Sequence, residues 1–147
     1  MKKFQRKAGV LWEGDLQNGN GLISTESQAL FEQPYSFETR FEEKPGTNPE
    51  ELIAAAHAAC FSMAFASALK KEGFSPKRVD TNAVCSMESQ DNGGFKITKM
   101  QLHVRGQVPD IDAKTFEKIA QKADKGCPVS NLLRPGLEIE IAVELVE

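Results

Sequence analysis

The 147-residue chain lacks the features of several common protein classes. Its net charge is −3, and no cluster of lysine and arginine is dense enough to follow a phosphate backbone, so nucleic acid is not an expected partner. The basic residues after Met1 are not followed by an apolar segment, so the pattern is not that of a secretory signal and favours a cytoplasmic protein. No linker or repeat divides the sequence. We therefore expect one domain over residues 1–147.

Cysteine is also scarce, with only Cys60, Cys85 and Cys127 in the chain. Three cysteines in a reducing compartment favour thiols or a transient disulfide over a structural disulfide framework. Cys60 lies in an apolar run, where a cysteine is usually a small hydrophobic core residue. Cys127 stands between a glycine and a proline, which is a very different setting. This pair of cysteines is the feature of the sequence that says most about function.

The longest apolar segment covers residues 52–69 and consists mainly of alanine. Its length approaches that of a membrane span, but a histidine and two serines interrupt it, which favours a buried central helix and no membrane contact. Asn48 can cap its start, Pro49 suits its first turn, and Gly73 suits its end. Small side chains let helices approach closely, and the chain offers only one other long helix. We therefore expect two copies of the central helix to pack together in a homodimer.

Alternation of apolar and polar side chains predicts six strands: residues 4–12, 21–27, 35–41, 78–89, 95–108 and 137–145. An Asp-Asn-Gly-Gly turn between the fourth and fifth of these indicates a hairpin. Residues 112–124 carry apolar side chains at helical spacing and predict a second, amphipathic helix. The order β-β-β-α-β-β-α-β favours an α+β fold in which antiparallel sheets pack on the central helix.

The residues around Cys127 indicate the start of a helix. Gly126 suits the end of the preceding helix, Cys127 lies near the N-cap, and Pro128 suits the first helical position. Backbone N–H groups and the positive end of the helix dipole favour a thiolate at such a position. Cys85 falls on the inward face of its strand, so we expect it to be a core side chain.

Three motifs together resemble the OsmC/Ohr family of thiol peroxidases: residues 46–52 (GTNPEEL), 57–64 (HAACFSMA) and 127–130 (CPVS). Residues 12–15, 24–27 and 35–41 further resemble the osmotically inducible OsmC branch. The resemblance implies an OsmC/Ohr-like α+β fold, an intertwined homodimer, and reduction of organic hydroperoxides to alcohols in oxidative and osmotic stress defence. It implies no cofactor, and it implies electrons from a dithiol reductant such as lipoyl groups.

Two cysteines are sufficient for this chemistry. A thiolate attacks the distal oxygen of the peroxide and becomes a sulfenic acid as the alcohol leaves, and a second thiol then condenses with it to a disulfide. Cys60 suits the attacking role, because its apolar neighbours would hold the organic part of the substrate. Cys127 suits the resolving role.

A buried thiol needs a nearby cation to ionise at neutral pH, and the resemblance supplies Arg40 for Cys60. On alternation alone Arg40 would be a solvent-facing residue of a strand. The resemblance also supplies Glu50 as the carboxylate that the arginine fork holds, although it could simply be a carboxylate at a helix N-terminus. Ten residues of helix place Glu50 about 15 Å from Cys60, too far to share one site on one chain. We therefore expect Glu50 to act from the partner subunit.

The sequence leaves two other functions open, zinc binding and ligand binding without turnover. His57, Cys60, Cys127 and perhaps Cys85 offer nitrogen and sulfur ligands for zinc, although their spacing differs from that of common zinc modules. A redox-sensing or small-ligand-binding module would use the same pocket without turnover. His57 also suggests a Cys-His nucleophile, but no oxyanion-hole glycine motif accompanies it, so a hydrogen-bonded core histidine is the favoured interpretation. His103 is expected at the surface or on a sheet face.

Overall fold

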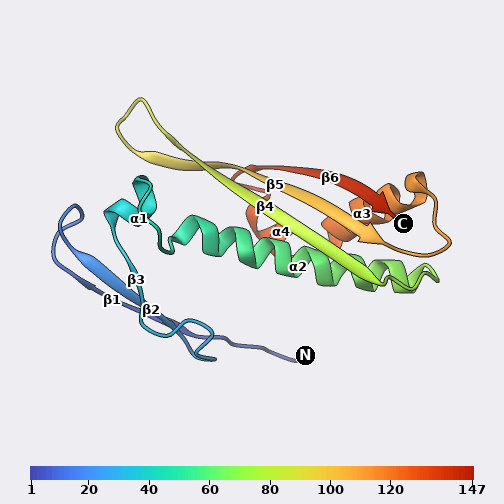
Figure 1. Cartoon of the computed structure of the whole chain (residues 1–147), viewed down its shortest axis with the longest axis horizontal. Coiled ribbons are helices and arrows are strands. Elements are labelled where there is room, and N and C mark those ends of the chain that lie inside the picture. The colour runs from blue at the N-terminus through green and yellow to red at the C-terminus, as the bar shows by residue number, and fades with distance from the viewer. The chain divides into compact units, whose positions relative to one another are not determined.

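The computed structural model describes all 147 residues, which form two compact units, Met1–Leu52 and Ile53–Glu147 (Figure 1). The first unit holds three strands and a short helix, and the second holds three strands and two helices. A long helix begins in the first unit and continues into the second. The content of helices and strands confirms the predicted α+β class. A single domain over residues 1–147 stays a prediction.

The first unit holds an antiparallel sheet of β1 (Ala8–Glu13), β2 (Asn20–Thr25) and β3 (Gln33–Tyr35), in that order. Two of the predicted strands are therefore confirmed with shifted ends. The turn between β1 and β2 forms because the Asn18 backbone N–H donates a hydrogen bond of 2.8 Å to the Asp15 carboxylate.

The strand predicted over residues 35–41 is wrong, because the chain turns into helix α1 (Phe37–Phe41) directly after β3. A capping box starts this helix: the Thr39 backbone N–H donates to Ser36 Oγ, and the Ser36 backbone N–H donates to Thr39 Oγ1. The alternation of aromatic residues that suggested a strand is overridden by this local bonding. Arg40 therefore lies in the last turn of a helix.

Helix α2 (Pro49–Lys71) starts and ends where the sequence indicates. The Glu51 backbone N–H donates a 2.8 Å hydrogen bond to Asn48 Oδ1, which confirms the predicted N-terminal cap. At the other end Gly73 adopts a φ of 90°, and its N–H donates to the Lys70 carbonyl oxygen. Helix α2, which carries Cys60, is thus capped at both ends.

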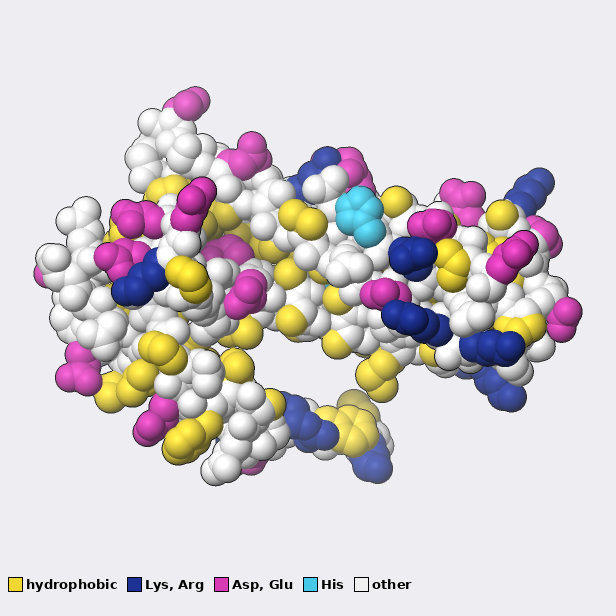
Figure 2. Space-filling model, viewed as in Figure 1, with side chains coloured by type: hydrophobic (Ala, Val, Ile, Leu, Met, Phe, Trp, Pro, Cys, Tyr) yellow, Lys and Arg dark blue, Asp and Glu magenta, His cyan; other side chains and the backbone are white.

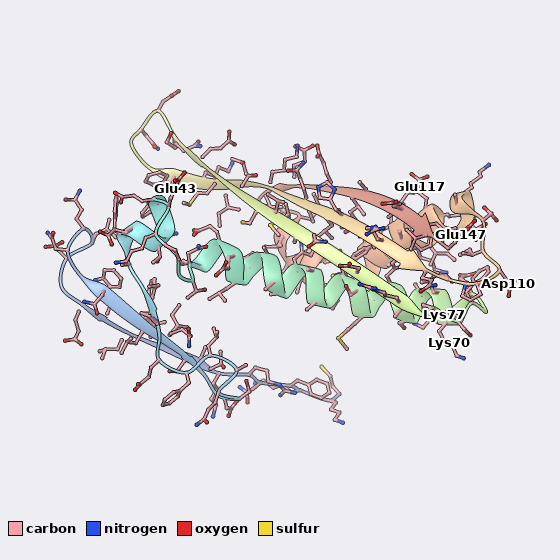
Figure 3. All side chains as sticks on the ribbon, viewed as in Figure 1. Glu43, Lys70, Lys77, Asp110, Glu117 and Glu147 are labelled. Carbon is pink, nitrogen blue, oxygen red and sulfur yellow. The ribbon has the colours of Figure 1, made fainter.

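The second unit holds the sheet β4 (Arg78–Ser89), β5 (Phe95–Gln107) and β6 (Glu138–Val146), with β5 in the middle. β4 and β5 form the predicted antiparallel hairpin, but β6 pairs with β5 in parallel, so the expectation of antiparallel sheets is wrong for this strand. The reason is the connection, because α3 (Ala113–Gly126) and α4 (Pro128–Leu133) carry the chain back across the sheet before β6 begins. The end of β6 lies beside two loops, the one that precedes β4 and the one that follows β5. Lys77, Asp110 and Glu147 are labelled at this edge of the sheet in Figure 3.

The core of the second unit lies between α2, the sheet and α3. Phe61, Phe65 and Leu69 project from one side of α2 and are completely buried. Phe116 of α3 packs on Phe65 with the ring centroids 5.0 Å apart. Gly106 of β5 makes room for the Phe116 ring, because a Cβ there would lie 2.5 Å from its Cζ. The predicted amphipathic helix and its buried face are therefore confirmed.

The opposite side of α2 is exposed in the single chain, with Ala55, Ala56, Ala59 and Met63 at the surface. Met63 is 76% exposed, and hydrophobic side chains gather over α2 in Figure 2. Only 28% of the most apolar stretch of α2 is buried, so the predicted buried central helix is buried on one side only. By length and composition α2 would also pass for a membrane-spanning helix, as do core helices of soluble proteins.

Candidate active site

Cys60 lies in the middle of α2, half-buried and with a free thiol. It packs against the buried cluster that contains Cys127, and the Cys127 thiol is close enough to raise the pKa of Cys60. The backbone N–H of Val129, in the first turn of α4, lies close enough to the Cys60 sulfur to lower the pKa of the thiol. The structure therefore brings together the two cysteines that the sequence singled out.

The surroundings of Cys60 favour the neutral thiol. Burial is the main cause of a raised pKa of Cys60, the neighbouring Cys127 thiol raises it further, and the Val129 N–H partly opposes this rise. No cation is among the groups that shift the pKa. The second unit thus provides an apolar setting for the Cys60 thiol, with the Val129 backbone N–H beside it.

Cys127 is the N-cap of α4, as predicted. It is completely buried, and its sulfur accepts a 3.5 Å hydrogen bond from the Ser130 backbone N–H. Pro128 occupies the first helical position, where its missing N–H is not needed. The break between α3 and α4 thereby turns the Cys127 side chain into the core against α2.

Arg40 and Glu50 form a forked ion pair in the first unit. Arg40 Nη2 lies 2.7 Å from Glu50 Oε1, and Arg40 Nε donates to both carboxylate oxygens at 3.1 and 3.3 Å. The side chain of Arg40 is 34% exposed and that of Glu50 only 11%. Asn48 helps to hold this geometry, because its Nδ2 donates a 3.2 Å hydrogen bond to the Thr39 carbonyl oxygen and so ties α1 to the start of α2.

Residues 41–142 match the family described as OsmC-like protein. The chain belongs to the OsmC-like protein family. It is 52% identical over 137 residues to Peroxiredoxin OsmC of Escherichia coli (strain K12), covering 93% of this chain and 95% of that protein. It is 30% identical over 103 residues to organic hydroperoxide resistance protein OhrB of Bacillus subtilis (strain 168), covering 70% and 74% of the two chains. These matches confirm the family that the motifs indicated.

Solved structures confirm the OsmC-like fold. The crystal structure of an OsmC-like protein from Mycoplasma pneumoniae superimposes with a TM-score of 0.76 at 17% identity, over the full length of both chains. A crystal structure of an OsmC protein from Legionella pneumophila gives a TM-score of 0.74 at 24% identity, over 98% of this chain and 99% of that one. At these identities the similarity concerns the fold alone.

Two other residues that the sequence singled out, Cys85 and His103, lie on the sheet of the second unit of this OsmC-like chain. Cys85 is half-buried on β4, opposite Met100 of β5, and His103 is exposed on β5. No three histidine, cysteine or acidic side chains gather into a potential metal site anywhere in the chain. The arrangement of residues therefore gives no support to the zinc alternative.

His57 is completely buried, and its Nε2 lies 2.7 Å from Ser130 Oγ. The expected hydrogen-bonded core histidine is thus confirmed. Its partner Ser130 is the residue that sequence reasoning missed, because 73 positions separate the two and no local pattern pairs them. The one available signal was that Ser130 lies three residues after the Cys127 cap, so that it belongs to the first turn of α4.

Proposed function

We propose that this OsmC-like protein is a thiol-dependent peroxidase that reduces organic hydroperoxides to alcohols, with Cys60 as the attacking and Cys127 as the resolving cysteine. The packing of Cys60 against the buried cluster that contains Cys127 is the observation that carries this proposal. The names of the relatives, a peroxiredoxin and an organic hydroperoxide resistance protein, support the activity.

The reaction takes two steps at the sulfur atoms. The Cys60 thiolate attacks the distal peroxide oxygen, the O–O bond breaks, and the departing alkoxide takes up a proton to become the alcohol. Cys127 then attacks the Cys60 sulfenic acid, water leaves, and a disulfide forms. Because Cys60 packs against the cluster that contains Cys127, the second step requires only local movement of the Cys127 side chain away from its capping position. A dithiol reductant, with lipoyl groups as the candidate, returns both cysteines to thiols.

The surroundings of Cys60 favour an organic substrate over hydrogen peroxide. Cys60 packs against a cluster that includes Phe61 and Phe65, and Ala64 follows it on the next turn of α2. Apolar walls of this kind bind the hydrocarbon part of a hydroperoxide and exclude water from the reacting oxygen. Hydrogen peroxide has no hydrocarbon part that these apolar side chains could bind.

The length of α2 between Glu50 and Cys60 suggests that the working site needs two chains. Cys60 has a raised pKa and needs a cation to ionise, and the Arg40 guanidinium of the Arg40–Glu50 pair is a cation that could bind both a thiolate and a peroxide oxygen. Glu50 lies ten residues before Cys60 on α2, a rise of about 15 Å. We therefore place Arg40 and Glu50 of one subunit beside Cys60 of its partner, in a homodimer located in the cytoplasm.

The exposed side of α2 supports this dimer. Ala55, Ala59 and Met63 lie one turn apart on the side that the chain leaves uncovered. A second copy of the same helix would cover these small apolar side chains and complete the core on both sides of α2.

The direct test is to add one equivalent of cumene hydroperoxide to the reduced protein, follow peroxide loss and map the cysteines by mass spectrometry. Rapid stoichiometric loss with a Cys60–Cys127 disulfide is the expected result. In the Cys127→Ser variant the peroxide should still be consumed once, leaving oxidised Cys60 without the disulfide. Thiols that stay reduced in the parent protein would overturn the proposal.

A further inference from the structure

His57 is a buried polar residue that the peroxide reaction does not use. Its ring is completely buried in α2, one helical turn before Cys60, and its Nε2 bonds Ser130 Oγ of α4 at 2.7 Å. Burial lowers the pKa of His57, which keeps the ring neutral near neutral pH, while the nearby Asp124 carboxylate opposes and the Arg134 guanidinium adds to this shift. Nε2 is used by Ser130 and Nδ1 makes no hydrogen bond, so the ring bonds neither cysteine sulfur.

The residue that His57 holds belongs to the turn whose N–H groups lie close to both sulfur atoms. The Ser130 backbone N–H donates to Cys127 Sγ at 3.5 Å, and the N–H of the preceding Val129 lies close to the Cys60 sulfur, where it lowers the pKa of that thiol. Ser130 is itself completely buried. A shift of the first turn of α4 would therefore change the surroundings of both sulfur atoms at once.

We propose that His57 is a positioning residue: through Ser130 it fastens the first turn of α4 to α2, so that the Val129 N–H stays directed at the Cys60 sulfur and Cys127 stays within its reach. The inference rests on the proposed roles of Cys60 and Cys127. The histidine side chain suits this task because it spans from the α2 backbone to a hydroxyl on the facing helix and carries no charge into the core. Loss of the bond would leave a buried polar atom on each side without a partner.

The test measures the rate at which iodoacetamide alkylates Cys60 as a function of pH, with peptide mass spectrometry to separate the three cysteines. In Ser130→Ala and in His57→Leu the alkylation profile should shift to higher pH by about one unit, because the Val129 N–H no longer stabilises the thiolate. In His57→Gln, whose side-chain amide can bond the same hydroxyl, most of this shift should disappear. The alkylation profile of the double variant His57→Leu, Ser130→Ala should shift no further than that of either single variant.

Ser62→Ala is the matched control. Ser62 also lies on α2, two residues after Cys60, and its Oγ hydrogen-bonds Thr81 Oγ1 of β4 at 2.7 Å and the Ala58 carbonyl oxygen of α2 at 2.8 Å. This variant should leave the Cys60 profile unchanged. An equal shift in Ser62→Ala would show general loosening of α2 and overturn the proposal.

Two further results would also overturn it. One is a folded Ser130→Ala protein whose profile superimposes on that of the parent, and the other is a His57→Gln protein as shifted as His57→Leu. Thermal unfolding of each variant establishes that it is folded, and Ser130→Ala decides the matter if His57→Leu does not fold. Alkylation needs no peroxide turnover, so these outcomes are independent of whether the proposed peroxidase activity is found.

Discussion

The two proposed parts of the active site of this OsmC-like chain are a charged region, Arg40 and Glu50, and a thiol region, Cys60 and Cys127. They differ in almost every physical respect. Arg40 and Glu50 are ten positions apart, charged, and joined by a forked ion pair whose arginine is one-third exposed. Cys60 and Cys127 come from distant parts of the sequence and pack together in an apolar core. One region holds the proposed cation, and the other holds the proposed nucleophile, whose surroundings raise its pKa. In the proposed reaction each region supplies what the other lacks.

Removal of the nucleophile from the thiol region should have the largest effect. Cys60→Ser replaces a polarisable thiol by a hydroxyl that does not ionise at neutral pH, so peroxide reduction should fall by more than about 10³-fold. Stopped-flow measurement of cumene hydroperoxide loss gives the rate. Activity within tenfold of the parent would assign the attack to another cysteine.

Removal of the cation from the charged region should have the next largest effect. Arg40→Met should lower the peroxide reaction rate at neutral pH by about 10²–10³-fold, because charge stabilisation of the thiolate and the departing oxygen is lost. The remaining activity should rise with pH, since the pKa of Cys60 is raised by burial and by Cys127.

Lys44→Met is the control for Arg40→Met. Lys44 forms a 2.6 Å ion pair with Glu38 in the same unit, but both side chains are about half exposed. Its replacement should change the rate by less than about twofold, as is typical of surface ion pairs. Similar losses in the two variants would mean that Arg40 acts only through the general charge of the protein.

Protonation of His57, which lies one helical turn before Cys60, should have a smaller effect, on the pH dependence of stability. The folded protein lowers the pKa of His57 below 6.5, mainly through burial, so the unfolded chain binds a proton first as the pH falls. Stability should therefore decrease below about pH 6.5, with the Tm falling by about 2–4 °C for each kcal/mol lost. Calorimetry between pH 7.5 and 5 tests this. His57→Gln should flatten the dependence, whereas His103→Gln, at an exposed position, should leave it unchanged.

Cys85 should give the smallest effect of all. It is half-buried on β4 and has no place in the proposed reaction, so Cys85→Ala should keep the peroxidase rate within about twofold and lower stability by about 1 kcal/mol or less. A large loss of rate in a folded variant would extend the thiol region to a third cysteine.

Features that depend on neighbouring residues were predictable from the sequence. Asn48 and Cys127 could be recognised as helix caps, and residues 91–94 as a hairpin turn, because each structure is decided by a few adjacent side chains. The family could be recognised because several short motifs occur together. Arg40 and Glu50 were accessible only through that family, since nothing local marks them as a pair.

Features that depend on competition or on distance were not predictable. Residues 37–41 satisfy a strand pattern, yet the Ser36 and Thr39 capping box favours a helix. Alternation identified β6 as a strand but says nothing of its direction, which the α3–α4 crossover decides. The bond between His57 and Ser130 joins residues 73 positions apart and appears only when α4 packs on α2. Long-range pairing of this kind is a property of the folded core.

The most direct test of the account is to combine the two regions from different chains. One chain carries Arg40→Met and Glu50→Ala, the other carries Cys60→Ser, and differently tagged subunits allow the heterodimer to be purified. If the charged pair acts across the interface, the heterodimer has one intact site and should recover about half of the parental rate. A rate no higher than that of the Arg40→Met, Glu50→Ala protein alone, or failure of the two chains to form a dimer, would contradict it.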